Sequence, residues 1–353
     1  MSTQLASVAK ALVAPGKGIL AADESTGTAA KRFAPLNIPQ TEEMRRKYRD
    51  LLFTTPEFGA HFSGVILYDE TIHQNGLRGK TFVEILQADG VQPGIKLDTG
   101  AQPMALAGPD EKVTEGLDGL AKRVDAYVKL GATFAKWRAV IAIDEKTGIP
   151  SDACIHANAH ALARYAAICQ AGGLVPIVEP EILMDGDHAS HSIETSFRVH
   201  ERTLHHVFNE LHRANVVVEE MILKPSMVIA GQKSGTKNSV REVAEETLSV
   251  LLRYVPAAVP GIAFLSGGQA DVEATAHLNE INVLAKDAHA PWPLTFSYGR
   301  ALQQAALNIW KGNDANVAPA QAALHHRARM NALAALGLWS PEREKEETLV
   351  LSS

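Results

Sequence analysis

Charged side chains stand inside several short apolar runs of this sequence. Lys136 lies in Phe-Ala-Lys-Trp-Arg, Lys224 in Ile-Leu-Lys-Pro, and Glu179 directly after Leu-Val-Pro-Ile-Val. A charge among apolar neighbours is costly unless it is paired or serves a function. These three residues are therefore the first candidates for a functional site.

More charged residues occur at or just after the ends of other apolar runs. They are Asp23, Lys96, Arg138, Glu181 and Arg300. Side chains two positions apart in a strand point to the same side, so Lys136 shares a side with Arg138. Glu179 shares a side with Glu181 in the same way. A structural ion pair explains either pair taken alone, whereas charges that converge from several strands favour one shared site.

A lysine beside a second cation and two carboxylates suits covalent chemistry on a carbonyl group. The ammonium form is not nucleophilic, and a neighbouring cation together with partial desolvation favours the neutral amine. Lys224 is the candidate nucleophile and Lys136 the neighbouring cation. The two glutamates can donate and accept protons during imine formation, so such a site needs no metal ion.

Two glycine-containing segments follow the last two apolar runs. Ser266-Gly267-Gly268 comes after the seventh run, and Ser297-Tyr298-Gly299-Arg300 comes after the eighth. The loops at these two places in a barrel often hold phosphate on backbone N–H groups. A tight turn explains the Gly-Gly pair by itself, but the arginine beside the second segment favours phosphate binding.

The elements that position these residues follow from eight apolar runs rich in β-branched residues. The runs are 18–22, 64–68, 94–97, 133–140, 174–178, 221–223, 262–265 and 293–296. Helical periodicity separates them, for example over 150–172, 190–214 and 239–254. The alternation, with no Gly-x-Gly-x-x-Gly after a strand, favours a closed (β/α)₈ TIM barrel over an open doubly wound sheet. Periodicity alone does not distinguish the two.

The 353 residues are expected to form one domain, because no linker rich in glycine or serine divides them. The barrel core is placed at about 16–310, after a short N-terminal helix. Helices around 301–310 and 319–336, followed by a mobile tail over 341–353, complete the chain.

The composition of the sequence limits the classes of binding partner and the cell compartment that we expect. The formal charge is −6, from 34 basic and 40 acidic side chains, and no long block of like charge is present, which disfavours nucleic-acid binding. No stretch approaches the length of a membrane span, and no signal peptide is recognisable. With the two cysteines interpreted as buried thiols, a cytoplasmic protein is expected; a transit peptide removed beforehand stays open.

Six segments resemble those of class I fructose-bisphosphate aldolases, and they occur in the same order. They are 14–27, 134–138, 175–182, 223–227, 264–269 and 295–302, and they include Ala-Ala-Asp-Glu-Ser-Thr-Gly and Leu-Lys-Pro-Ser-Met. The resemblance extends from about residue 11 to about residue 336. It implies reversible cleavage of fructose 1,6-bisphosphate to dihydroxyacetone phosphate and glyceraldehyde 3-phosphate, without a cofactor, by a homotetramer.

The same resemblance assigns roles to the catalytic candidates. Lys224 would form the Schiff base with C2 of the open-chain ketose. Glu179 would be the main general acid and base, with Glu181 orienting it. Lys136 would be the neighbouring cation, and Asp23 would engage the C4 hydroxyl, whose deprotonation breaks the C3–C4 bond.

The resemblance also places a phosphate at each end of the substrate. One lies on Ser266, Gly267, Gly299 and Arg300, and the other on Ser25, Lys96 and Arg138. Thr28 stands where the family commonly has a second serine, which keeps the hydroxyl but adds a methyl group. Many relatives end in a tyrosine that carries the C3 proton, whereas this sequence ends Leu-Ser-Ser, so we expect another group or water to protonate the enamine slowly.

Two other functions stay open at this point. One is a different Schiff-base sugar-phosphate enzyme, similar to transaldolase or deoxyribose-phosphate aldolase, which the two phosphate clusters disfavour. The other is a catalytically silent scaffold protein, which the occupied catalytic positions disfavour. A metal site on His156 and His160, four residues apart, is disfavoured because the Glu-x-x element of such motifs is missing.

Overall fold

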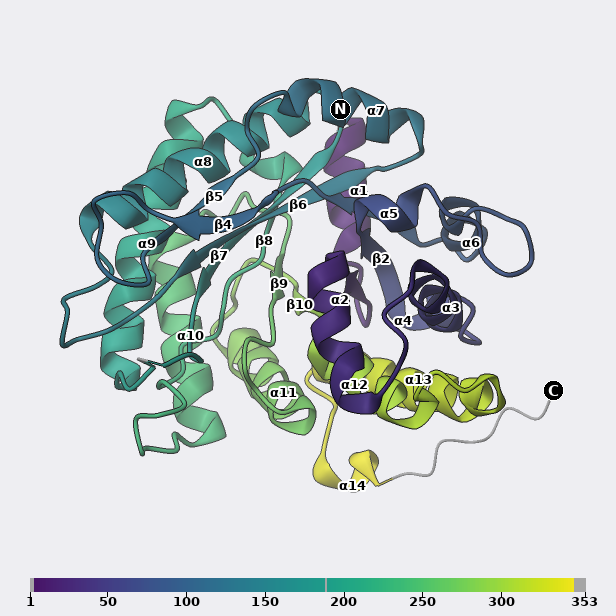
Figure 1. Ribbon diagram of the computed structural model, residues 1–353. Helices are drawn as coiled ribbons and strands as arrows, with labels where there is room; N and C mark the ends of the chain where they lie inside the picture. Colours follow the sequence, from purple (N-terminus) through teal and green to yellow (C-terminus); the bar gives the residue numbers. More distant parts are fainter. Residues whose placement is uncertain (1–2, 188, 346–353) are drawn as a thin grey trace.

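Parallel strands form a closed barrel with helices outside it in the computed structural model, which describes residues 3–187 and 189–345 (Figure 1). The barrel strands are β1 (Gly18–Ala22), β2 (Phe62–Leu67), β3 (Gln92–Lys96), β6 (Phe134–Ile141), β7 (Val175–Ile182), β8 (Ile222–Leu223), β9 (Ile262–Phe264) and β10 (Leu294–Tyr298). Because β1 pairs with both β10 and β2, the sheet has no open edge there. The predicted (β/α)₈ barrel is confirmed and the open doubly wound sheet is excluded.

Helices follow the strands as predicted. They are α1 (Gln4–Leu12), α2 (Thr26–Phe33), α3 (Glu42–Phe53), α4 (Phe58–His61), α5 (Asp69–Ile72), α6 (Phe82–Ala88), α7 (Leu120–Lys129), α8 (Asp152–Ala171), α9 (Ile193–Arg213), α10 (Val240–Tyr254), α11 (Asp271–Asp287), α12 (Arg300–Trp310), α13 (Val317–Ala334) and α14 (Pro341–Glu344). Helices α8, α9 and α10 each begin after a serine whose side chain accepts a hydrogen bond from the N–H group three residues on. In the described part of the chain, no helix is both long and apolar enough to cross a membrane.

The apolar core has two main layers and a small third cluster, which contains Ile141, Ile143, Cys154, Ile182 and Val199. The larger cluster lies between the strands and the outer helices, and includes Trp137, Tyr165 and Phe264. The smaller of the two main layers fills the interior of the barrel and contains Ala9 and Leu12 of α1, which closes the N-terminal end. Since catalytic groups in such barrels sit at the opposite end, this packing holds the strands without occupying the mouth.

Three features differ from the sequence prediction. Strand β7 runs on from Val178 to Ile182 despite two glutamates and a proline, because it stays paired with β6 up to Ile141. An antiparallel pair, β4 (Gly100–Pro103) and β5 (Lys112–Glu115), lies between β3 and α7, where no strand was predicted. The predicted tail begins with the short helix α14, and the rest of it, 346–353, lies outside the described residues.

Candidate active site

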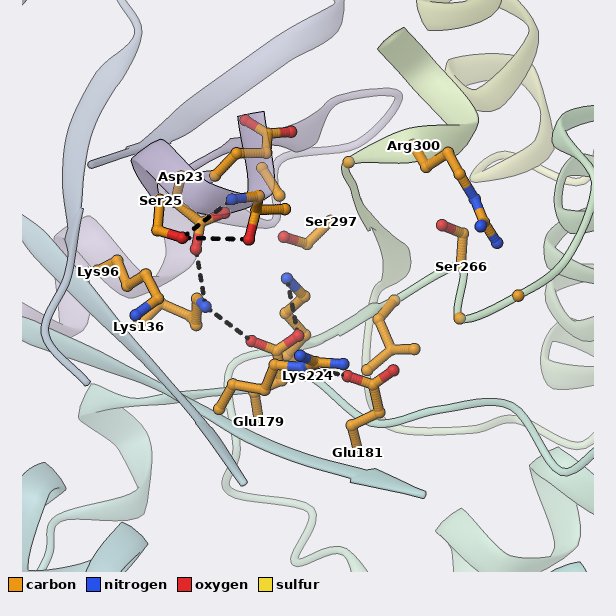
Figure 2. Close-up of a pocket in the computed structure, with 18 of the residues that line it drawn as sticks. Asp23, Ser25, Lys96, Lys136, Glu179, Glu181, Lys224, Ser266, Ser297 and Arg300 are labelled. Carbon is orange, nitrogen blue, oxygen red and sulfur yellow. Dashed lines mark hydrogen bonds and ion pairs between the residues drawn. The ribbon is translucent and has the colours of Figure 1, made fainter. Parts of the chain in front are cut away.

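A cavity of about 430 Å³ lies at the C-terminal ends of the barrel strands (Figure 2). Every residue selected from the sequence lines it: Asp23, Ser25, Thr28, Lys96, Lys136, Arg138, Glu179, Glu181, Lys224, Ser266, Gly267, Gly299 and Arg300. These residues come from strands, loops and helix starts that are far apart in the chain. The barrel therefore gathers the whole set around one opening.

Lys224 and Glu179 lie together at the floor of the cavity. Lys224 directly follows β8, and its backbone N–H donates to the carbonyl of Val178 at 2.8 Å. The Lys224 Nζ atom lies 3.1 Å from Glu179 Oε1, and the two residues are 3% and 4% exposed. An amine and a carboxylate at this distance can exchange a proton directly.

Lys136 lies among three carboxylates. Its Nζ atom is 2.7 Å from Asp23 Oδ2, 3.5 Å from Glu179 Oε2 and 3.7 Å from Asp98 Oδ2. Burial lowers the pKa of Lys136, but Asp23 and then Glu179 raise it by more, so the net shift is upward. Lys136 is therefore a fixed positive charge in the cavity.

Asp23 stays ionised for the complementary reason. Burial raises the pKa of its carboxyl group, but Lys136 and then Lys224 lower it by more, and the pKa lies well below its usual range. Asp23 directly follows β1, and its side chain points toward Lys136 in Figure 2. The site thus holds an anionic oxygen and a cationic nitrogen in contact, both largely shielded from water.

Two further cations lie near the rim, each already paired with a carboxylate. Arg138 Nε donates to Glu181, and the charge of this carboxylate raises the pKa of Arg138. Lys96 Nζ donates to Asp98, both to its side chain at 2.5 Å and to its backbone carbonyl at 2.6 Å. An anion that binds here replaces Glu181 or Asp98 as the hydrogen-bond acceptor of Arg138 or Lys96.

Anion-binding elements occur on both sides of the cavity. Ser266 and Gly267 follow β9, and Gly267 has a φ of +34°, which a side chain would strain. Arg300 opens α12, and Ser25 caps α2 by accepting from the Thr28 N–H group at 3.3 Å. Helix N-termini present free N–H groups to anions. Figure 2 shows Ser266 and Arg300 on one side and Ser25 and Lys96 on the other, with Lys224 and Glu179 between them.

Several cavity residues were not selected from the sequence. They are Ala21, Glu24, Asp185 and Leu265, and Asp98 forms ion pairs with Lys96 and Lys136. Gly268 and Ser297, from the two glycine-containing segments, also line the cavity, as does Arg32. Glu24 forms ion pairs with Arg32 and with Arg49, the latter at 2.6 Å. Burial raises the pKa of Glu24, but the two arginines lower it by more. Asp98 was detectable, because it directly follows the third apolar run, as the selected charged residues follow theirs.

The two histidines on α8 that were considered as metal ligands both contact the carboxylate of Glu210. His156 Nε2 lies 3.5 Å from Glu210 Oε1, and His160 Nδ1 lies 2.9 Å from Glu210 Oε2. Arg213 also donates to Glu210 at 2.8 Å. Among residues 3–187 and 189–345, no group of three or more histidine, cysteine or acidic side chains has a metal-binding arrangement.

Comparison with known proteins points to one family. The sequence profile of the family described as fructose-bisphosphate aldolase class-I matches residues 4–351. The chain is 57% identical over 337 residues to a probable fructose-bisphosphate aldolase class 1 of Xanthomonas axonopodis pv. citri, covering 95% of this chain and 98% of the relative. It is 52% identical over 324 residues to fructose-bisphosphate aldolase 4, cytosolic, of Arabidopsis thaliana, covering 92% and 80%.

A solved structure agrees with this match. The fructose-bisphosphate aldolase of Plasmodium falciparum, crystallised with TRAP and a small-molecule inhibitor, superimposes with a TM-score of 0.92 at 48% identity, covering 95% of each chain. The profile and the relatives extend over nearly the whole chain, and the barrel and its cavity are the structural counterpart of that match. The chain belongs to the class I fructose-bisphosphate aldolase family.

Proposed function

We propose that this aldolase cleaves fructose 1,6-bisphosphate reversibly through a Schiff base on Lys224. The observation that supports this most is the 3.1 Å contact between Lys224 Nζ and Glu179 Oε1 in a cavity that also holds Lys136 and Asp23. An amine at the floor of a cavity, with an acid and base beside it, is the arrangement that imine formation needs.

The amine of Lys224 attacks C2 of the open-chain ketose. Glu179 removes a proton from the Lys224 ammonium to free this amine, and after the attack the C2 oxygen takes a second proton from the nitrogen and becomes a hydroxyl. Glu179 then returns its proton to that hydroxyl, so that water leaves and a protonated imine remains. Glu181 lies two residues further along the same strand and is tied to Arg138, which fixes the position of this acidic pair. Lys136 stabilises negative charge that develops nearby.

Asp23 then accepts the proton of the C4 hydroxyl. The C3–C4 bond breaks, its electron pair moves into the imine system, and glyceraldehyde 3-phosphate departs from the resulting enamine. Protonation at C3 and hydrolysis of the imine release dihydroxyacetone phosphate and restore Lys224. The protonated imine accepts the electron pair of the broken C3–C4 bond and becomes the enamine, so no metal ion is required to stabilise a carbanion.

The two sides of the cavity suit the two phosphates of the substrate. One phosphate is assigned to Ser266, Gly267, Gly299 and Arg300, and the other to Ser25, Thr28, Lys96 and Arg138. Charged groups at both ends fix the ketone over the nucleophile, which converts binding energy into orientation. A single-phosphate substrate leaves one cluster without a partner.

Domain organisation, location, partners, oligomeric state and cofactor use are proposed from less specific observations. We assign the whole chain to one aldolase domain, in keeping with the family match over residues 4–351. A cytoplasmic location is supported by the name of the Arabidopsis thaliana relative. Sugar phosphates are the proposed partners, and the charge of −6 speaks against nucleic acid. A homotetramer and the absence of a metal cofactor rest on the family resemblance.

Cleavage of fructose 1,6-bisphosphate, followed through the triose phosphates released, tests the proposal. We expect activity that persists in strong chelator, and a loss in Lys224→Met of more than about 10³-fold in kcat. Full activity in that variant would contradict the mechanism. Equal kcat/KM for fructose 1-phosphate and the bisphosphate would favour the alternative of a single-phosphate aldolase, and no turnover of either would favour a silent scaffold.

A further inference from the structure

The strand that carries both catalytic glutamates is held unevenly by its two neighbours. On one side, β7 pairs with β6 along its whole length, up to Ile182 opposite Ile141. On the other side, the last register pair between β7 and β8 is Val178 with Leu223. Glu179 and Glu181 therefore lie on a stretch that β8 itself does not support.

A serine side chain takes over where the strand pairing stops. Ser226 Oγ accepts from the backbone N–H of Ile182 at 2.7 Å and donates to the carbonyl of the same residue at 3.0 Å. Ser226 is 7% exposed and Ile182 is 4% exposed. Without this hydroxyl, both backbone groups of Ile182 would lose a partner on this side in a site nearly closed to water.

The residues 224–226 thus attach the nucleophile to both neighbouring strands. Lys224 N–H bonds Val178 just before the glutamates, and the Ser226 hydroxyl bonds Ile182 just after them. Pro225 has no N–H group to offer, but its carbonyl accepts from Leu265, the residue before Ser266, at 3.1 Å. Lys224 and Ser226, the residues on either side of Pro225, therefore hold β7 just before and just after the stretch that carries the two glutamates.

We infer that Ser226 is a positioning residue for catalysis: its hydroxyl sets the end of β7 against the Lys224 segment and so fixes the Glu179–Lys224 distance. The inference rests on the proposed function. It predicts that loss of the hydroxyl impairs proton transfer at the imine more than it impairs substrate binding, because the phosphate-binding residues lie mostly on other elements.

A matched control exists at the opposite end of the barrel. Ser63 is also buried, and its hydroxyl donates to the backbone carbonyl of Leu12 at 2.6 Å, with the carbonyl of Gly18 as a second acceptor at 3.0 Å. Ser63→Ala removes the same chemical group from a comparable environment, beside α1 and outside the cavity. Any loss of stability from removing a buried, hydrogen-bonded serine hydroxyl should therefore occur in both variants.

The experiment compares Ser226→Ala, Ser63→Ala and the wild type for kcat, KM, the rate of borohydride-trapped adduct formation with dihydroxyacetone phosphate, and the denaturation midpoint. We expect both variants to unfold at lower denaturant, but only Ser226→Ala to lose kcat and trapping rate, by on the order of tenfold, with KM within about twofold. The thiol of Ser226→Cys forms weaker hydrogen bonds, so its kcat and trapping rate should lie between those of the wild type and Ser226→Ala. Ser226→Cys replaces the alanine variant if that variant does not fold.

Equal kcat and trapping rate in wild type and Ser226→Ala would overturn the inference while leaving the proposed function intact. An equal loss of kcat in Ser63→Ala would overturn it too, because a general loss of stability would then explain both. A wild-type protein that forms no adduct on Lys224 would overturn the proposed function, and this inference with it.

Discussion

Replacing Lys136 by methionine removes the cation around which three carboxylates are gathered. The nearest oxygens belong to Asp23, Glu179 and Asp98, at 2.7, 3.5 and 3.7 Å, and Lys136 is 3% exposed. Breaking a buried ion pair by removing one partner costs about 3–5 kcal/mol. Since one ammonium serves three carboxylates here, we expect Lys136→Met to lose about 5 kcal/mol of unfolding free energy at pH 7.

The loss should depend on pH, with a sign that follows from Asp23. In the wild type its pKa is depressed, so it contributes stability above the unfolded pKa of about 3.9, and that contribution is lost as pH falls through the native pKa. Without Lys136, burial raises the pKa of Asp23 with less to oppose it, and protonation relieves the variant as pH falls. The difference between the two proteins should shrink from pH 7 toward pH 4.

Urea or guanidinium unfolding at pH 7, 5.5 and 4.5 measures this difference directly. Lys233→Met is the control, because Lys233 pairs with Asp187 at 3.1 Å while both side chains are more than half exposed. Such a pair contributes about 0–1 kcal/mol. A loss below about 1 kcal/mol in Lys136→Met, or a loss that does not change between pH 4.5 and 7, would refute the argument from the buried carboxylates.

Three smaller changes probe the phosphate loops and the barrel interior. Arg138→Ala should lower kcat/KM for fructose 1,6-bisphosphate by about 10–100-fold in steady-state assays, because a charged hydrogen bond contributes about 1.5–3 kcal/mol, and an unchanged value would argue against phosphate binding there. Gly267→Ala forces a side chain to φ +34° and puts its Cβ 2.9 Å from Leu265 Cδ1, so KM should rise by about tenfold; an unchanged KM would remove this loop from the phosphate site. Gly94→Ala places a Cβ 2.2 Å from the Phe134 ring and should cost about 1–3 kcal/mol of unfolding free energy without altering KM, as denaturation and kinetics would test.

Much of the barrel is predictable because its strands are buried on both faces. Runs such as 18–22 and 262–265 are continuously apolar, and turns and amphipathic helices separate them. The end of β7 was not predictable in this way, because Glu179 and Glu181 end the apolar run. Their place in the strand depends on pairing with β6 and on Ser226, and local sequence does not show either contact.

The hairpin formed by β4 and β5 was missed for a different reason. Its strands have four residues each and are mostly half-buried or exposed, so they carry little alternation of apolar and polar side chains. The pair is positioned by tertiary contacts, such as the hydrogen bond from the Thr114 hydroxyl to the carbonyl of Arg138 at 2.7 Å. Short elements held by distant partners leave a weak local signal.

The residues that line the cavity were easier to predict than the hydrogen bonds and ion pairs that orient them. A lysine or a glutamate in an apolar run is conspicuous, and the barrel topology brings the strand ends together. The partners that orient those groups are less conspicuous. Glu24, held by Arg32 and Arg49, stands in the polar stretch Asp-Glu-Ser-Thr. Asp98, which contacts both Lys96 and Lys136, directly follows an apolar run and could have been selected.

Borohydride reduction in the presence of dihydroxyacetone phosphate, followed by peptide mass analysis, addresses the central claim most directly. If Lys224 forms the imine, the wild-type protein gains one reduced adduct on the peptide that contains Lys224, and activity is lost in proportion. Lys224→Met should show neither the adduct nor turnover. A stoichiometric adduct on any other lysine, or full turnover without a trappable adduct, would contradict the account.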